Sequence, residues 1–473
     1  MEGTEQKKVG LFSLTALVIG SMIGGGVFNL PKDMASGAGG LAIIIGWVIT
    51  AIGMVTLGLC FQNLTMKRPD LEGGVYSYAR AGFGEFMGFN SAWGYWVSAF
   101  LGNVAYGTLL FSSIGYFFPV FEGGQNVASI IGASVLLWGV HWLVLQGVHS
   151  ATIINAVVTI AKMVPLLLFI VVMIFAFHIK EFSLGFLGNL DSFSWSGVGA
   201  QVKSTMLVTL WVFIGIEGAV VFSTRAKNRS DIGKATVMGL LGTILIYILV
   251  TLLSLGVMSQ EEIAALDNPS MGYILEHVVG KWGAVVINAG IIVAVLGAWL
   301  GWTMLAAEIP MLAAKDKVFP KWFGKLNKNE AASNSMWLTN GLIQVFLLTF
   351  LVTEEAYEFA FSLASSAILV PYVFSALYQA KYSLKSKESD RMRNIIIGFV
   401  ASIYGIWLVI AAGMDYLLLT MIIYALGIVV FWMARKENKA KKIFTTVELV
   451  IAIAFVILAI FAIYQLATGH ITI

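Results

Sequence analysis

Long runs of apolar residues, separated by short polar segments, follow one another along this chain of 473 residues. A run of about 20 apolar residues is long enough to cross the ~30 Å hydrocarbon core of a bilayer as a helix. We therefore expect an all-α polytopic membrane protein without a sizeable soluble domain. The pattern predicts thirteen spans, near 11–34, 40–64, 87–116, 126–146, 151–178, 200–224, 233–258, 278–308, 336–353, 357–382, 393–412, 415–434 and 443–468.

The composition agrees with a membrane location. The chain is 59% hydrophobic and only 12% charged, whereas about 25% of the residues in soluble domains are charged. The single cysteine, Cys60, excludes an internal disulfide. The five histidines are scattered along the chain, so we expect no metal site, no cofactor and no nucleic-acid partner. The expected partners are the lipid bilayer and a small molecule.

Basic residues are divided unequally between the two sides of the predicted topology. If the N-terminus is cytoplasmic, 24 of the 29 Lys and Arg fall in inner segments, and outer loops hold only Lys32, Lys180 and Lys281. This bias predicts a cytoplasmic N-terminus in the plasma membrane, the inner membrane of a bacterium. The outer loops are rich in Asp and Glu. They either attract a cationic substrate or form an ordinary solvated rim.

Three consecutive glycines lie in the middle of the first span, in "IGSMIGGGVFNLP" at 19–31. A glycine costs about 1 kcal/mol relative to alanine in a helix interior. One explanation is a close helix crossing, because small residues are common at such contacts in membranes. The other is a broken helix lining a cavity, because irregular backbone in a membrane must face protein or water.

A second glycine-interrupted span favours the broken helix. "TLWVFIGIEGAVVF", at 209–222, carries Gly215 and Gly218 in mid-span. Each interrupted span opens a group of five spans, 11–178 and 200–382, and further helices follow at 393–468. Because five is an odd number, the second group enters the membrane from the opposite side. Paired interruptions in two inverted halves point to a transporter site near the middle of the membrane.

Broken helices expose the groups that bind a zwitterion. The N-terminus of a half-helix offers backbone N–H groups and positive partial charge, and the C-terminus offers carbonyl groups. These ends suit the carboxylate and the ammonium of an α-amino acid. Two charged residues also lie inside spans, Glu217 and Lys162. A charge inside the membrane is costly and indicates function by default, although a lysine is also able to snorkel to the surface.

Four stretches carry a family resemblance that covers nearly the whole chain. They are "GSMIGGGVFNLP", "RPDLEGGVYSYARAGFGEFMGFNSAWGYW" at 68–96, "TLWVFIGIEGA", and "WLGWTMLAAEIPMLAAKDKVFPKWF" at 299–323. They resemble the amino acid–polyamine–organocation transporters, and within these the basic amino acid antiporters, most closely the arginine/ornithine and lysine exchangers. The resemblance implies the five-plus-five inverted-repeat fold of the leucine-transporter type, with the first and sixth helices broken. The family usually has twelve spans, and this chain predicts thirteen.

The resemblance also implies a substrate site. The first break would bind the α-carboxylate, the sixth-span break the α-ammonium, and two Trp rings would flank the side chain. A cation over an indole face gains ~2 kcal/mol when desolvated. Asn103 and the serine pair of the tenth span are equally compatible with interhelical hydrogen bonds or packing. The implied substrate-binding residues are Ser21, Ile23, Gly24, Gly25, Gly26, Asn103, Trp211, Ile214, Gly215, Gly218, Trp302, Ser365 and Ser366.

Four further residues are candidates for coupling or gating. Glu217 would tie the broken sixth helix to its neighbours or relay a proton. Lys162 would replace the cation of sodium-coupled relatives and hold spans one, five and eight together. Trp299, one helix turn before Trp302, is a weaker gating candidate. Glu308 lies near the inner end of its span, where we expect a salt bridge to a basic loop.

The function that we expect is exchange without covalent chemistry, with arginine entering and ornithine leaving. One alternative is proton-coupled uptake of a basic or neutral amino acid, and another is exchange of lysine or arginine for a decarboxylated amine. A channel would show a filter loop or a ring of charges, and an enzyme would show clustered His, Asp or Cys within the spans. We expect neither. The oligomeric state stays open, and a homodimer is compatible with the sequence.

Overall fold

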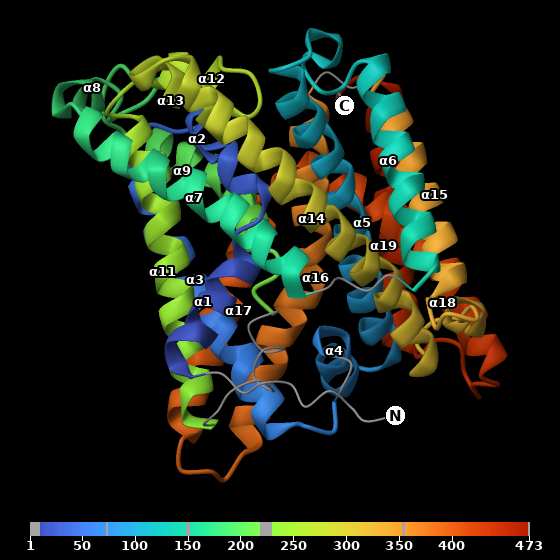
Figure 1. Ribbon diagram of the computed structural model, residues 1–473. Coiled ribbons are helices and arrows are strands. Elements are labelled where there is room, and N and C mark those ends of the chain that lie inside the picture. Colours follow the sequence, from blue (N-terminus) through green and yellow to red (C-terminus); the bar gives the residue numbers. More distant parts are fainter. Residues whose placement is uncertain (1–9, 72–73, 148–151, 218–228, 352–354, 472–473) are drawn as a thin grey trace.

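The structure is a computed structural model that describes residues 10–71, 74–147, 152–217, 229–351 and 355–471. Within these ranges every regular element is an α-helix or a short 3-10 helix, and no strand occurs. The long helices run side by side in one bundle (Figure 1). The all-α fold class predicted from the sequence is confirmed.

Ten helices in the described part are long and apolar enough to cross a membrane. They are α3 (Gly40–Lys67), α5 (Glu85–Gly115), α6 (Val127–Leu145), α7 (Thr152–Ala176), α11 (Arg229–Ser254), α14 (Lys281–Lys315), α16 (Ala356–Lys385), α17 (Arg391–Ala411), α18 (Met414–Glu437) and α19 (Thr446–Ala467). Each of the other three predicted spans contains a helix that falls short of this criterion in length or in hydropathy. These are α1 (Leu11–Met22) in the first, α9 (Trp195–Phe213) in the sixth and α15 (Ser333–Thr349) in the ninth.

Helices α5 and α16 form the centre of the bundle and pack against each other. In the most apolar 18-residue stretch of α5, 94% is buried inside the protein, compared with 22% in the corresponding stretch of α19. The mean hydropathy of α5 is also lower than that of α19, because a helix surrounded by protein does not need a uniformly apolar surface. Helix α19 faces outward with large apolar side chains, as expected for a lipid-facing helix.

Short helices gather at the two ends of the bundle (Figure 1). At one end lie α2 (Leu30–Ala35), α8 (Ile179–Leu184), α12 (Gln260–Ala264) and α13 (Ser270–Val279). Near the other end lies α4 (Val75–Phe83). Asn29, which directly precedes α2, connects this helix to α13. Its side-chain oxygen accepts a 3.0 Å hydrogen bond from the N–H of Ser270, the first residue of α13. The residues flanking α4 include the basic segments that the topology assigns to the inner side.

The first span is interrupted at the glycine triplet, as predicted. Helix α1 ends at Met22, and Ile23 and Gly24 have extended backbone. The chain then forms the 3-10 helix η1 (Gly25–Phe28) before α2 begins. The N-cap residue of η1 is Gly24, which has no side chain to cap the first-turn N–H groups. The backbone of Gly25 instead contacts the Tyr106 hydroxyl.

The helix of the sixth span also ends inside the predicted span. Helix α9 ends at Phe213, and Ile214 has extended backbone. Gly215 follows with φ of +105°, a conformation that only glycine adopts readily. The structure describes this span up to Glu217, and the predicted Gly218 lies outside the described residues.

The two interruptions lie side by side. The hydroxyl of Tyr247, on α11, is 3.1 Å from the Met22 carbonyl oxygen and 2.9 Å from the Val212 carbonyl oxygen, so it shares its proton between both broken spans. The broken-helix geometry predicted from the paired glycines is therefore present. The division into repeats at 11–178 and 200–382, with 393–468 added, stays a prediction.

Candidate functional site

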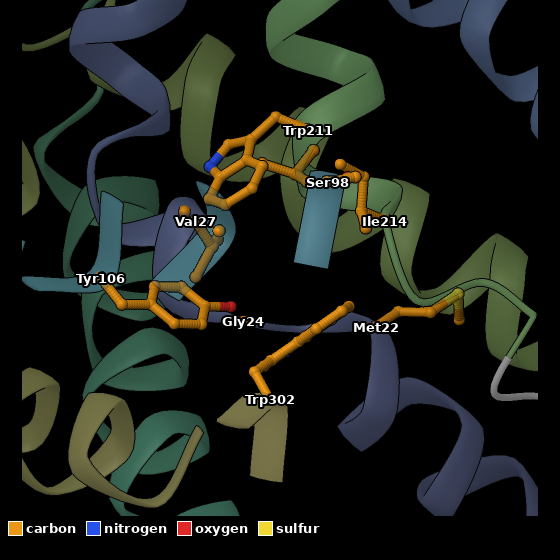
Figure 2. Close-up of a pocket in the computed structure, with 11 residues that line it drawn as sticks. Met22, Gly24, Val27, Ser98, Tyr106, Trp211, Ile214 and Trp302 are labelled. Atoms are coloured by element: carbon orange, nitrogen blue, oxygen red, sulfur yellow. The ribbon is translucent and has the colours of Figure 1, made fainter. Parts of the chain in front are cut away.

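A cavity of about 380 Å³ lies where the two interruptions meet. It is narrow: only about 20 Å³ of this space is wide enough to hold the centre of a water molecule. Figure 2 shows Trp211 and Trp302 on opposite sides of it, with Gly24 between them and Tyr106 to one side. Its walls come from both breaks, from α5 and from α14. The lining residues are Met22, Gly24, Gly26, Val27, Ser98, Gly102, Tyr106, Trp211, Val212, Ile214 and Trp302.

The glycine triplet lets two aromatic side chains approach the backbone of the first break. A Cβ atom on Gly24 would lie 2.7 Å from the Tyr106 hydroxyl oxygen, and one on Gly26 would lie 2.6 Å from Trp211 Nε1. Gly25 is also tightly enclosed, by Leu109, Tyr106 and Val295. Both explanations considered for the triplet therefore apply: the helix is broken, and its neighbours are also very close.

Trp211 connects the cavity to an aromatic cluster on α16. Its Nε1 donates a 3.3 Å hydrogen bond to the Tyr357 hydroxyl, and its ring stacks on Phe361 with centroids 6.0 Å apart. Tyr357 and Phe361 are themselves buried. They lie in the first two turns of α16 and pack behind Trp211, without lining the cavity themselves.

Trp302 and Tyr106 form the opposite part of the wall. The Tyr106 hydroxyl lies close to the Trp302 indole and to the Gly25 backbone. Its ring is tilted against Trp211, with centroids 6.0 Å apart. Trp302 is half-buried and projects from α14. Sequence reasoning predicted both Trp residues but missed Tyr106, although "GNVAYG" contains it.

Lys162 contacts the carbonyl end of α1. Its ammonium donates to the carbonyl oxygens of Gly20 and Ile23, the latter at 2.9 Å. Ile23 is fully buried. Its carbonyl oxygen, like that of Gly20, accepts from the lysine and does not face the cavity. Lys162 thus joins spans one and five. Within the described part of the chain it forms no hydrogen bond with span eight.

Glu217 contacts two helices of the bundle. Its carboxylate accepts a 2.7 Å hydrogen bond from the Tyr95 hydroxyl on α5 and a 2.6 Å hydrogen bond from the Tyr372 hydroxyl on α16. Charge-assisted bonds of this kind are about twice as strong as neutral ones. The side chain therefore ties the broken sixth span to both central helices and does not line the cavity.

Several predicted residues lie away from the cavity. Asn103 donates to Thr303 on α14 at 3.3 Å, and Ser365 donates to the Leu207 carbonyl on α9 at 3.3 Å. Ser366 is buried near them in α16. Trp299 is fully buried and packs against Gly107 of α5. Asn103, Ser365 and Trp299 thus make contacts between helices, whereas the Ser366 hydroxyl has no hydrogen-bond partner in the described part of the chain. The predicted roles of all four toward substrate or gating stay predictions.

Two other predicted residues are placed only in part. The backbone of Ser21 belongs to the last turn of α1, and its side chain lies outside what the structure describes. Glu308 is exposed near the end of α14. Among the described residues no basic side chain forms an ion pair with Glu308. Nor do the described residues contain a group of three or more His, Cys, Asp or Glu able to hold a metal.

Two broken membrane helices around an enclosed cavity define a secondary transporter. The sequence comparisons then identify the family: the chain belongs to the amino acid permease family, whose model matches residues 9–416. The resemblance stated from the motifs is confirmed. The protein is thus a multi-pass membrane transporter whose small-molecule substrate is an amino acid.

Its curated relatives are similar over their whole length. The chain is 49% identical to an arginine/ornithine antiporter of Pseudomonas aeruginosa, with 100% of both chains covered. It is 45% identical to an arginine/ornithine antiporter of Latilactobacillus sakei, over 99% of this chain and 98% of that one. It is 40% identical to an arginine/agmatine antiporter of Chlamydia caviae, over 99% of each.

A solved structure supports the fold independently. The transporter MhsT, in complex with L-phenylalanine, superposes with a TM-score of 0.55 at 15% sequence identity. The match covers 87% of this chain and 100% of MhsT. At this low identity the similarity concerns the fold alone, and it agrees with the leucine-transporter-type architecture that the family resemblance implies.

Proposed function

We propose that this protein exchanges cationic amino acids across the membrane, with arginine entering and ornithine leaving, by sodium-independent alternating access. The observation that carries the proposal is the cavity between the two breaks, flanked by Trp211 and Trp302. The names of the relatives at 49% and 45% identity support the choice of substrates.

The breaks supply the groups that recognise the common part of every amino acid. The first-turn N–H groups of η1, at Gly25 and Gly26, would donate to the α-carboxylate, because the N-terminus of a helix favours an anion. The carbonyl groups of the non-helical backbone at Ile214 and Gly215 would accept from the α-ammonium. Glycine at these positions lets the substrate approach the backbone closely.

The side chain of the substrate would be recognised by aromatic rings. Among the described lining residues none carries a carboxylate. A guanidinium or ammonium group between Trp211, Trp302 and Tyr106 would instead gain cation–π stabilisation of ~2 kcal/mol where it is desolvated. Because no ion pair forms, the substrate would be held weakly enough to leave on the other side.

Lys162 supports sodium independence. Its ammonium already occupies the carbonyl end of α1, where a bound cation would otherwise be favourable. Replacing sodium by choline in the medium should leave exchange unchanged. A requirement for sodium would contradict this part of the proposal.

We further propose that the N-terminus faces the cytoplasm of a bacterial inner membrane and that α19 faces lipid. Only Lys32, Lys180 and Lys281 are basic among the predicted outer loops. In this orientation Tyr357 and Phe361 pack behind Trp211 on the outer side of the cavity. A homodimer is also proposed as compatible with the chain, and cross-linking of the purified protein would test it.

Uptake into vesicles tests the exchange directly. Labelled arginine is added to vesicles that contain the purified protein and are preloaded with ornithine, agmatine, lysine or no substrate. The proposal predicts rapid uptake with internal ornithine and almost none in empty vesicles. Equal uptake under all four conditions would rule out exchange and favour proton-coupled uptake.

A second exchange partner is favoured by one comparison. The Chlamydia caviae relative, at 40% identity, is an arginine/agmatine antiporter. Agmatine lacks the carboxylate that the N–H groups at Gly25 and Gly26 would bind. The vesicles preloaded with agmatine therefore distinguish the two partners: uptake above the level seen with ornithine would assign the amine as the exported substrate.

A further inference from the structure

A second, more open cavity, of about 630 Å³, lies at the end of the bundle where α3 and α16 end. This is the lower end in Figure 1, near α4. Unlike the central cavity, it is lined largely by basic side chains: Arg68 from the end of α3, and Lys381, Lys385 and Lys387 from the end of α16 and the residues after it. The only acidic lining residue among those described is Glu388.

One face of α16 supplies much of this lining. Tyr378, Lys381, Tyr382 and Lys385 follow the spacing i, i+3, i+4 and i+7, which places them on one side of a helix. The guanidinium of Arg68 lies 5.8 Å from the centroid of the Tyr378 ring and 6.0 Å from that of Tyr382. Basic and aromatic groups from separate parts of the chain therefore converge on one hollow.

The acidic groups of this region are already paired. Glu388 and Asp390 both bind the Lys67 ammonium, Asp390 at 2.6 Å. The hydrogen bond from Lys67 holds the pKa of Asp390 below its ordinary value. Arg68 is paired with Asp70 through bonds of 2.9 and 2.6 Å. These pairs leave a surplus of positive charge at the cavity.

That surplus belongs to three lysines. The Lys381 ammonium donates to the Gly82 carbonyl oxygen at 2.6 Å, a neutral acceptor. Lys385 and Lys387 are exposed. Within the described part of the chain no carboxylate forms an ion pair with any of the three. An anion in the cavity would meet three uncompensated ammonium groups.

From this arrangement we infer that the cavity binds the phosphate group of an anionic phospholipid. Phosphate oxygens accept short, charge-assisted bonds from ammonium groups, and basic pockets at the cytoplasmic ends of membrane helices suit lipid headgroups. Two exposed apolar residues are close in sequence to the lining lysines, Leu384 in the last turn of α16 and Met392 in the first turn of α17, and they would contact the acyl chains. The inference depends on the orientation proposed above and not on the identity of the transported substrate.

A bound headgroup would strengthen a contact between the two halves of the chain. Lys381 and Tyr378, on α16, already bind the Gly82 carbonyl at the end of α4 and Arg68 at the end of α3. The phosphate would add bonds to both sides of this contact. We therefore expect the lipid to raise the temperature at which the protein unfolds.

The test compares two double variants of the full-length protein purified in detergent. The first, K385Q/K387Q, removes two lysines of the cavity. The control, K441Q/K442Q, removes two exposed lysines of the segment before α19. Thermal unfolding is followed while short-chain phosphatidylglycerol or phosphatidylcholine is added. We expect phosphatidylglycerol to stabilise the wild type and the control, and its apparent affinity to fall roughly tenfold in K385Q/K387Q.

Three outcomes decide the inference. Equal affinity in both double variants overturns it, because the charge of the cavity would then be irrelevant. Equal stabilisation by phosphatidylcholine overturns it as well. Equal stabilisation by glycerol 3-phosphate or inorganic phosphate overturns the lipid assignment and identifies a site for a soluble phosphate. Arginine exchange is measured separately, so failure of exchange in the wild type contradicts the proposed function without affecting this result.

Discussion

The ammonium of Lys162 lies 2.9 Å from the carbonyl oxygen of Ile23, the residue at which the first span stops being helical. It also contacts the Gly20 carbonyl one turn earlier. A cation at the carboxyl end of a helix is favourable because the free carbonyls there carry negative partial charge. A lysine of the fifth span thus stabilises the interruption in the first.

We predict that Lys162→Met destabilises the protein and abolishes exchange. The substitution removes two bonds from a charged donor and leaves the carbonyls without a partner, which costs on the order of 2 kcal/mol. Thermal unfolding and arginine exchange measure the two effects. Lys203→Met is the matched control, because Lys203 is an exposed lysine within another predicted span, on α9. Equal stability of the two variants would contradict the role of Lys162.

Gly26→Ala should abolish exchange while leaving the protein folded. The new Cβ atom would lie 2.6 Å from Trp211 Nε1 and 3.0 Å from its Cδ1, so the ring must move out of the cavity wall. Gly139→Ala on α6 is the control, because no atom lies within 4 Å of its added Cβ. It should keep full exchange and gain up to about 1 kcal/mol of stability. Normal exchange by Gly26→Ala would show that the ring position is not critical.

The sequence predicted the two breaks because they are local. Gly24, Gly25 and Gly26, like Gly215, mark an interruption whatever surrounds them. The bridge made by Tyr247 was not predictable in this way. Its two carbonyl partners, at Met22 and Val212, are 225 and 35 residues distant, and only the packed bundle brings the three together.

The third-span residues show a second limit. Sequence reasoning singled out Asn103 because it is polar, yet the cavity is lined by Ser98, Gly102 and Tyr106. These three are spaced by four residues and share one face of α5. Asn103 is rotated by about 100° from Gly102 and binds Thr303 on α14. Residue type alone did not indicate which face of the helix meets the cavity.

Trp302→Leu should strongly weaken binding of cationic substrate without affecting expression. Leucine retains apolar contact but has no ring face for the guanidinium, so about 2 kcal/mol of cation–π stabilisation is lost, a weakening of roughly 30-fold. Scintillation proximity binding of labelled arginine to the purified protein measures it. Trp282→Leu, at an exposed position of the same helix, should bind normally. Normal affinity in Trp302→Leu would refute the stacking role.

The last prediction concerns Glu217, which accepts hydrogen bonds from Tyr95 and Tyr372. Removing one hydroxyl, in Tyr95→Phe or Tyr372→Phe, leaves the carboxylate with one bond and should cost about 1.5–3 kcal/mol. Removing both leaves a charge without a donor inside the bundle, so the double variant should lose more stability than the two single losses combined. Glu217→Gln in the double-Phe background should restore part of this loss, because the neutral amide needs no charge-assisted donor. Thermal unfolding of the five proteins gives the comparison, with Tyr464→Phe on the exposed face of α19 as the control. Strictly additive losses, without rescue by Gln, would mean that Glu217 is solvated from the inner side and is not held by the two tyrosines.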